Sequence, residues 1–333
     1  MKLNRRYFLY SSSCACAQRA IFPFLTASMA LQSTSANAAI PEMKAVQVSA
    51  NAYFVQGLAA LGSKENQNFI SNAGFVVTPK SVVVIDALGS PALAQRFVQL
   101  IKTITPLPIS HVIVTHYHAD HIYGLQVFKD LGAHIIAHSA AGEYLNSDTA
   151  TLRLKASREE LSPWVDENTR LVVADEMLKG SSPKNLQVNG VDFYIAPAGP
   201  AHTPEDLIIY LPAEKVLFAG DLVFRGRLPF VGGADSKHWI SSLNKLLQFD
   251  VAVIVPGHGA QSSAASAKAD IELVRNYLVY LREQMGAAVK NLESFDEAYK
   301  ATNWKAFENV PMFGFANRMN AYNTYLLMEK ESL

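Results

Sequence analysis

The feature that most constrains this chain is a cluster of histidines that follows directly on a short apolar strand. The strand, Ile109 to Thr115, leads into the run His116-Tyr117-His118-Ala119-Asp120-His121. The first two histidines share one face, because strand side chains repeat every two residues, and the following turn can bring the aspartate and the third histidine nearby. Neutral imidazoles and carboxylates are suitable zinc ligands, whereas buried imidazoles without partners are costly. The run therefore predicts a metal site at the end of a strand.

Three later residues of the same kinds stand at strand ends or in turns. His202 lies in a proline-rich turn between two strands, and Asp221 follows the strand Val216 to Ala219 through a glycine. His258 stands between two glycines, after a strand that ends at Val255. Each of these alone would be an ordinary capping or turn residue. Together with the first run, they indicate ligands that converge on one rim.

Apolar runs and segments with helical spacing alternate along the rest of the chain. Strands are expected over residues 44–56, 72–78, 81–86, 109–115, 133–137, 191–196, 207–211, 216–219 and 251–255. Helices are expected over residues 90–103, 122–131, 236–247, 264–285, 293–301 and 314–331. This order predicts an α/β protein in which two sheets pack as a sandwich with outer helices. Periodicity alone does not distinguish it from a doubly wound sheet.

The first 38 residues have the composition of an export signal. Arg5-Arg6 precedes a moderately apolar run from Ala20 to Leu31, and Ala36-Asn37-Ala38 is a small-x-small cleavage sequence. The paired arginines resemble a twin-arginine signal. The apolar run is shorter than the ~20 residues that a membrane span needs. We therefore expect residues 1–38 to be a removable signal, and residues 39–333 to be an exported, periplasmic domain with a C-terminal helical extension.

Cysteine usage and charge narrow the classes of ligand and partner. Cys14 and Cys16 both lie in the signal, so the mature chain has neither a disulfide nor a thiolate ligand. Removing the four basic residues of the signal from the total of 29 leaves 25 basic against 29 acidic residues, a net charge of −4. No basic stretch suggests nucleic acid, and no later segment has the length of a membrane span. A small-molecule substrate is the expected partner.

The order and spacing of these residues resemble the metallo-β-lactamase superfamily from about residue 46 to residue 260. The resemblance implies a four-layer αβ/βα sandwich with two metal ions at one edge, zinc being expected and iron or manganese being alternatives. Asp86, which ends its strand, matches the family's acidic residue behind the histidines, where it would orient an imidazole. The implied ligands are His116, His118 and His202 for the first metal and Asp120, His121 and His258 for the second, with Asp221 as the bridge.

The resemblance also implies metal-assisted hydrolysis. A hydroxide shared by two zinc ions would attack a carbonyl or similar centre, and Asp120 would orient it and later take its proton. We therefore expect an exported zinc-dependent hydrolase that cleaves an ester, thioester, lactone or amide-type bond. Zinc β-lactamases of the commonest subclass have a cysteine where this chain has Asp221, so only weak β-lactamase activity is expected. An aspartate there resembles glyoxalase II, whose glutathione thioester is cytosolic.

Two other functions stay open on the same motif. Sulfur dioxygenases of the superfamily hold one iron with two histidines and a carboxylate, here His116, His202 and Asp221. The strings around His202, around Asp221 and at residues 317–322 also resemble exported zinc metallohydrolases found beside quinoprotein dehydrogenase and sulfur-oxidation systems. The third alternative is therefore an accessory metal-binding protein that serves a periplasmic redox system.

Several side chains near the predicted rim have no motif position. Arg225 and Arg227 could attract an anionic substrate, since arginine binds a carboxylate through two parallel hydrogen bonds. A salt bridge or an outward position is the plainer expectation for each. Phe230 and Trp239 could line a pocket, with core packing as the plainer expectation. His138 ends a strand and could approach the site, but it is not included among the ligands.

Overall fold

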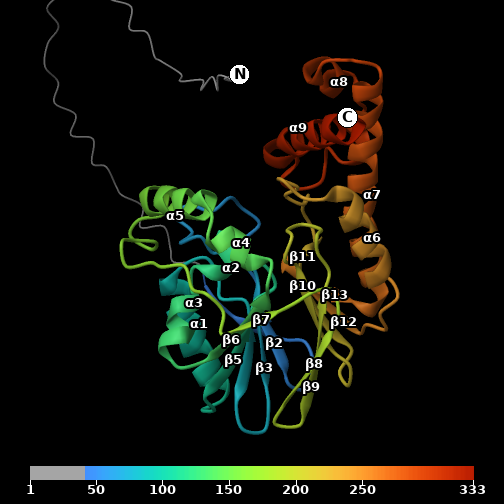
Figure 1. Ribbon diagram of the computed structural model, residues 1–333. Coiled ribbons are helices and arrows are strands. Elements are labelled where there is room, and N and C mark those ends of the chain that lie inside the picture. The colour runs from blue at the N-terminus through green and yellow to red at the C-terminus, as the bar shows by residue number, and fades with distance from the viewer. Residues whose placement is uncertain (1–41) are drawn as a thin grey trace, which may run out of the picture. The chain divides into compact units, whose positions relative to one another are not determined.

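Two β-sheets form the centre of the computed structural model, which describes residues 42–333 (Figure 1). The predicted signal therefore lies outside the described residues. The first sheet has seven strands in chain order: β1 (Ala45–Gln47), β2 (Ala52–Val55), β3 (Ala73–Val77), β4 (Val82–Ile85), β5 (Ile109–Ile113), β6 (His134–His138) and β7 (Glu176–Leu178). The second has six, in the order β13 (Ser262–Ser263), β12 (Val253–His258), β11 (Val216–Phe224), β10 (Leu207–Leu211), β9 (Val191–Pro197) and β8 (Lys184–Val188).

Helices cover the outer faces of both sheets (Figure 1). Those of the first half are α1 (Pro91–Ile104), α2 (Ala119–Ile122), α3 (Leu125–Asp130), α4 (Ala141–Leu145) and α5 (Asp148–Glu160). Those of the second half are α6 (Ser236–Leu246), α7 (Ala264–Lys290), α8 (Phe295–Ala301) and α9 (Phe313–Ser332), of which the last two pack against α7 (Figure 1). Among residues 42–333, no helix combines the length and apolar character of a membrane span.

The hydrophobic core has three parts, one for each interface between layers. Phe97 and Phe128 lie in a cluster between the first sheet and its helices. Phe193 and Phe218 lie between the two sheets, and Trp239 lies in a cluster between the second sheet and its helices. Burying each large aromatic side chain removes 150–250 Å² from water, roughly. The order helix, sheet, sheet, helix confirms the predicted four-layer αβ/βα sandwich.

Strand direction brings the predicted ligand segments to one edge. Strands β3 and β4 form an antiparallel hairpin, whereas β4, β5 and β6 run parallel. In the second sheet β11 and β12 are also parallel. The carboxyl ends of parallel strands meet at the same edge, where crevices between loops form. The histidine run follows β5, Asp221 lies in β11, and His258 ends β12.

Several predicted elements were wrong in detail, among them the strand expected to end at Val255, which continues as β12 through His258. The expected strand 44–56 is a hairpin of β1 and β2, because Ser49 and Asn51 turn the chain and bond the Glu214 carboxylate. The expected helix 122–131 is two short helices. They break at Gly124, whose N–H donates to the carbonyl of Leu88 instead of continuing the helix.

The second-half strand that carries Asp221 is longer than expected. It continues from Val216 to Phe224 instead of ending at Ala219, so Asp221 lies within the strand. Gly220 has φ +52°, and the pairing with β12 shifts on both sides of it. This irregularity turns the local backbone at the edge where the ligands meet. Helices α4 and α5 and strands β7 and β8 were not predicted; α5 is polar over most of its surface.

Candidate metal centre

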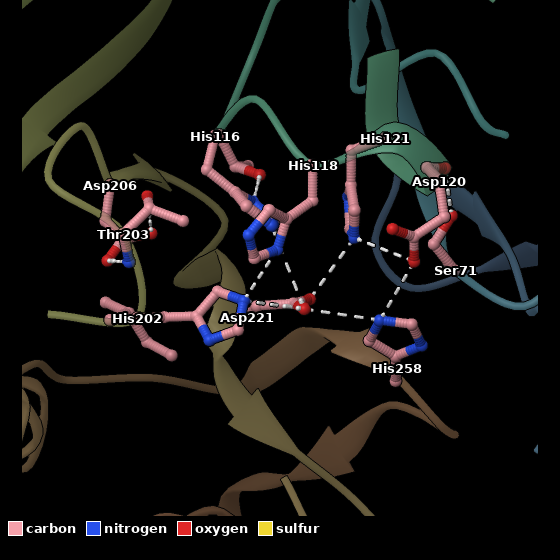
Figure 2. A network of polar contacts seen from close by, with 12 residues as sticks. Ser71, His116, His118, Asp120, His121, His202, Thr203, Asp206, Asp221 and His258 are labelled. Atoms are coloured by element: carbon pink, nitrogen blue, oxygen red, sulfur yellow. Dashed lines mark hydrogen bonds and ion pairs between the residues drawn. The ribbon is translucent and has the colours of Figure 1, made fainter. Parts of the chain in front are cut away.

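Seven histidine and aspartate side chains from the two sheets meet at this edge and point toward one another (Figure 2). Two histidines come from the loop after β5, and the next aspartate and histidine from the first turn of α2. The others come from the β9–β10 turn, from β11 and from the end of β12. All the predicted ligands are therefore brought together: His116, His118, Asp120, His121, His202, Asp221 and His258.

The first group joins three histidines to Asp221. His118 Nδ1 lies 3.0 Å from His202 Nε2, and Asp221 Oδ2 lies 3.3 Å from that same Nε2. His116 Nε2 is 3.8 Å from Asp221 Oδ2. Ligand atoms on a tetrahedral zinc with bonds of about 2.0–2.1 Å are about 3.3 Å apart. The spacing of this group therefore fits one tetrahedral ion.

The second group lies against the same aspartate. Asp120 Oδ2 is 3.3 Å from His258 Nε2 and 3.7 Å from His121 Nε2. Asp221 reaches this group too, with Oδ1 3.2 Å from His121 Nε2 and Oδ2 3.3 Å from His258 Nε2. The Asp221 carboxylate thus stands between the two groups, at ligand distance from histidines of both.

The donor atoms themselves fit a metal. Nε2 of His116 is buried without a hydrogen-bond partner, and Nε2 of His121 and Oδ1 of Asp221 lie 3.2 Å apart as an ion pair without hydrogen-bond geometry. Such atoms are rare in folded proteins, because each costs about 1–3 kcal/mol when it is left unpaired. The donors are nitrogen and oxygen atoms only, a set that suits zinc, iron or manganese.

Asp86 fixes the orientation of two imidazoles from behind. Its carboxylate accepts hydrogen bonds from the Thr115 N–H (2.7 Å), from the Thr115 hydroxyl (2.8 Å) and from His121 Nδ1 (2.9 Å). Because the Thr115 hydroxyl donates to Asp86, its oxygen accepts from His116 Nδ1 at 3.0 Å. Both imidazoles therefore turn Nε2 toward the centre. The buried Asp86 has φ +60°, a left-handed conformation that aspartate tolerates better than most residues.

The segment between β2 and β3 holds His258 from the other sheet. The Ile70 carbonyl accepts a hydrogen bond from His258 Nδ1 at 2.7 Å, which leaves Nε2 facing the centre. Asn72 donates to the carbonyls of Pro256 (2.7 Å) and Gly259 (2.8 Å). These contacts clamp the end of β12 onto the first sheet.

The turn that carries His202 is closed by its own polar residues. Asp206 accepts from the Thr203 N–H and from the Thr203 hydroxyl, each at 2.8 Å (Figure 2). Burial raises the pKa of Asp206 to about 7. The Trp239 ring centroid lies 5.1 Å from that of His202 and closes the other side.

Two glycines are required by close packing inside the centre. A Cβ on Gly257 would lie 1.9 Å from Asp221 Oδ1, and a Cβ on Gly220 would lie 2.9 Å from the Thr115 side chain. Gly220 also has a positive φ, which favours glycine. A side chain at Gly257 would displace the Asp221 carboxylate, and one at Gly220 would displace Thr115, which bonds Asp86.

Charge divides the histidines into two classes. Burial and the neighbouring imidazoles hold the pKa of His116 well below its ordinary value and lower the pKa of His118 to about 3. Burial acts in the same direction on His121 and His258, but the carboxylates beside them, chiefly Asp221, outweigh it. They raise the pKa of His258 to about 9 and that of His121 well above its ordinary value. Without a metal, the second group therefore holds protons.

The other side chains considered near the predicted rim differ in burial and in their partners. Arg225 Nε is 3.0 Å from Asp270 Oδ2, as expected of a salt bridge, whereas Arg227 is buried. Trp239 is fully buried and Phe230 is 39% exposed. His138 lies outside the cluster, 3.0 Å from the Gly180 carbonyl.

A family model described as the metallo-beta-lactamase superfamily matches residues 67–258, more than half of the chain. The chain belongs to this superfamily. Its predicted identity as a metal-dependent hydrolase of that family is confirmed at this level. Helices α7, α8 and α9 follow the matched region.

The individual relatives of this chain are distant in sequence and diverse in their named activities. Metallo-beta-lactamase IND-1 of Chryseobacterium indologenes is 25% identical over 67% of this chain and 85% of its own length. A linear primary-alkylsulfatase of Pseudomonas sp. is 23% identical over 63% of this chain and 45% of its own length. The 2,4-dinitroanisole O-demethylase subunit alpha of Nocardioides sp. is 28% identical over 58% of this chain and 53% of its own length.

Solved structures agree with the fold. A metallo-beta-lactamase from Pontibacter korlensis has a TM-score of 0.55 at 20% identity, over 71% of this chain and 99% of its own. The inverting sec-alkylsulfatase Pisa1 from Pseudomonas sp. has a TM-score of 0.69 at 16% identity, over 86% of this chain and 50% of its own. At these identities the likeness shows the superfamily fold and not a substrate.

Asp86 was expected to orient an imidazole and bonds His121 Nδ1, but the other residues that support the ligands could not be predicted from the sequence. Asn72 and Ile70 contact the loop of His258 across more than 180 residues of chain, and no local pattern reports such a contact. The Ser71 hydroxyl donates to the Asp120 carbonyl at 2.5 Å, and no local sequence pattern indicated this contact either. Thr115 stood next to the histidine run, and its hydroxyl was the one signal that could have indicated a link to Asp86.

Proposed function

We propose that this protein is an exported zinc-dependent hydrolase that cleaves an ester, thioester, lactone or amide-type bond at a two-metal site. One observation carries the proposal: the Asp221 carboxylate lies 3.3 Å from His202 of one ligand group and 3.3 Å from His258 of the other. His116, His118 and His202 would hold the first ion, and Asp120, His121 and His258 the second, with Asp221 shared. When bound, the ions would supply an acidified water and positive charge for the scissile group.

Asp120 is the residue best placed to handle a proton. Its side chain is 17% exposed, whereas that of Asp221 is 5% exposed. The nearby imidazoles of His121 and His258 hold its pKa well below the ordinary value, although burial acts in the opposite direction. Asp120 therefore stays ionised at neutral pH. It can accept a hydrogen bond from a reacting water and orient it toward the substrate.

The complete second group favours two metals over the one iron of a sulfur dioxygenase. His121 is held by Asp86, His258 by Ile70, and the backbone of Asp120 by Ser71. A mononuclear site needs none of these three supports. The fixed orientation of these three ligands also argues against a purely accessory role.

Metal analysis and a substrate panel test the proposal together. The purified protein is expected to carry two zinc ions per chain and to hydrolyse at least one member of a panel of thioesters, lactones, esters and β-lactams. Asp120→Asn is expected to lower kcat by about 10²–10⁴-fold, the usual effect of losing a proton-transfer group. One iron per chain with oxygen uptake would establish the dioxygenase instead. Metal-dependent turnover of no panel member would favour the accessory role.

We also propose that the protein acts in the periplasm. The support is the order of residues 1–38, with Arg5-Arg6 before an apolar run and a small-x-small cleavage sequence. Cell fractionation tests it, with Arg5→Lys combined with Arg6→Lys as the export-blocked variant. Wild type is expected in the periplasmic fraction, without its first 38 residues, and the double variant in the cytosol. Recovery of both in the cytosol would contradict export.

A further inference from the structure

The outer nitrogen of His202 lacks the support that other ligand histidines have. Three of them bond an oxygen atom through the nitrogen that faces away from the centre: His116, His121 and His258. In His202 this nitrogen, Nδ1, is buried without a hydrogen-bond partner, while Nε2 lies 3.3 Å from Asp221 Oδ2 (Figure 2). An imidazole that binds a metal through Nε2 carries its proton on Nδ1, and that N–H normally donates to an oxygen atom. His202 therefore needs another kind of partner.

The carboxylates of the same turn are already used. Asp206 accepts from the N–H and from the hydroxyl of Thr203, each at 2.8 Å. Glu205 accepts from the Tyr117 N–H at 3.1 Å. Neither carboxylate has a hydrogen bond to Nδ1 of His202.

Aromatic rings take the place of an oxygen acceptor beside His202. The indole of Trp239 lies with its ring centroid 5.1 Å from that of the imidazole and its plane at 65° to it. The Phe224 ring is farther away, at 5.9 Å and 67°. The face of an aromatic ring carries partial negative charge, so an N–H directed at it is stabilised. Trp239 presents the nearer and larger ring.

Trp239 is itself fixed by the strand that carries the shared carboxylate. The side chain is fully buried, and its Nε1–H donates to the Leu222 carbonyl at 3.1 Å. Leu222 directly follows Asp221 in β11. One side chain thus contacts His202 and the backbone next to Asp221, which are two ligands of the first group.

Helix α6 holds the His202 turn on both sides of this contact. The N–H of Asp235, at the start of the helix, donates to the Ala201 carbonyl at 2.9 Å. The Ser242 hydroxyl donates to the Ala198 carbonyl at 2.7 Å. Trp239 stands four residues after the first and three before the second, so the three contacts share one face of the helix. The turn and the indole are therefore held in a fixed relation.

We propose that Trp239 is a positioning residue of the metal centre, whose indole ring accepts the Nδ1–H of His202 and whose own N–H holds the strand beside Asp221. The inference rests on the metal site of the proposed function and not on the bond that is cleaved. It assigns to a core tryptophan the task that an oxygen atom performs for the other three histidines. The affinity of the first group for metal should then depend on this side chain.

Proton NMR of the zinc-loaded protein, labelled with ¹⁵N in histidine, tests the contact itself. An N–H above an aromatic face is shielded by the ring current, whereas an N–H bonded to oxygen resonates downfield. Wild type is expected to show one slowly exchanging imidazole N–H line upfield of those of His121 and His258. Trp239→Phe keeps an aromatic face and should keep the line upfield, and Trp239→Leu should move it downfield. A wild-type spectrum without the upfield line would overturn the inference.

Stepwise zinc affinities, measured by competition with a chromogenic chelator, test the consequence. Trp239→Leu is expected to weaken one of two zinc ions by about 10–100-fold, the usual effect of losing the support of a ligand. The other ion should bind as in wild type, because the second group has supports of its own. Trp239→Phe should restore part of the loss.

Trp304→Leu is the matched control. Trp304 is half-buried, and its Nε1–H also donates to a backbone carbonyl, that of Tyr299 at 3.1 Å. This variant should bind both ions like wild type. An equal loss of both ions in Trp239→Leu would indicate a general loss of structure and count against a positioning role.

The two measurements separate the inference from the proposed function. A single ion in the first group, with the upfield line present, would support the role of Trp239 and count against the two-metal hydrolase. Two ions and hydrolysis without the upfield line would leave the hydrolase standing and remove that role.

Discussion

The carboxylate of Asp86 controls two ligands at once, because Thr115 and His121 both bond it. Asp86→Asn preserves size but replaces one acceptor oxygen by a donor. We expect metal affinity to fall by about 10–100-fold, the usual effect of losing a hydrogen bond that orients a ligand. Competition with a chromogenic chelator measures it. Asp250→Asn, which changes an exposed carboxylate paired with Lys215, is the control and should bind metal like wild type.

Protons compete with metal ions for His121 and His258. The pKa of His258, at about 9, and the raised pKa of His121 mean that both are protonated near pH 7 when no metal is bound. A metal must displace these protons, so affinity falls as pH falls, by about tenfold per pH unit for each proton displaced. Titration calorimetry with zinc, in two buffers of different ionisation enthalpy at pH 7, checks this. Binding heats that do not depend on the buffer would contradict it.

At the scale of elements, α9 supports the loop that follows β11. Asn320 bonds the backbone of Val231 and Pro229 and the hydroxyl of Tyr277, and all of its polar atoms are buried. Asn320→Leu leaves those groups unpaired, so the free energy of unfolding should fall by about 2–4 kcal/mol. Urea denaturation measures it. Asn323→Leu, on the same helix and half-buried, should change stability by less than about 1 kcal/mol.

Some helices and strands could be predicted from the sequence, and others could not. Strands such as Leu207–Leu211 were predictable because their apolar runs are continuous and local. The break between α2 and α3 was not, because it depends on a bond from Gly124 to Leu88 in another segment. The extension of β11 through Asp221 was hidden in the same way, since Gly220 suggests a strand end. The ligand types and the supporting Asp86 could be read from the sequence, whereas the other contacts that orient the ligands could not.

At the scale of the whole molecule, the metal site joins the two halves of the sandwich. Four of its side chains follow the first sheet and three belong to the second, so bound metal should stabilise the docked state. At a free zinc concentration 1,000 times Kd the gain is about 4 kcal/mol, which corresponds to about 6 °C in Tm for a chain of this size. Calorimetric scans before and after chelation measure it. Asp221→Asn should show a much smaller difference, and an equal difference would place the stabilising metal elsewhere.

The connection between the sheets has a further consequence. Residues 179–183, between β7 and β8, are all exposed, and every ligand lies well away from them in the sequence. A chain cut there would yield two fragments, with His116, His118, Asp120 and His121 on one and His202, Asp221 and His258 on the other. Neither fragment alone would carry a complete ligand set. Reassembly of the cut protein would then be reported by the metal itself, as in a two-part sensor whose signal requires both parts.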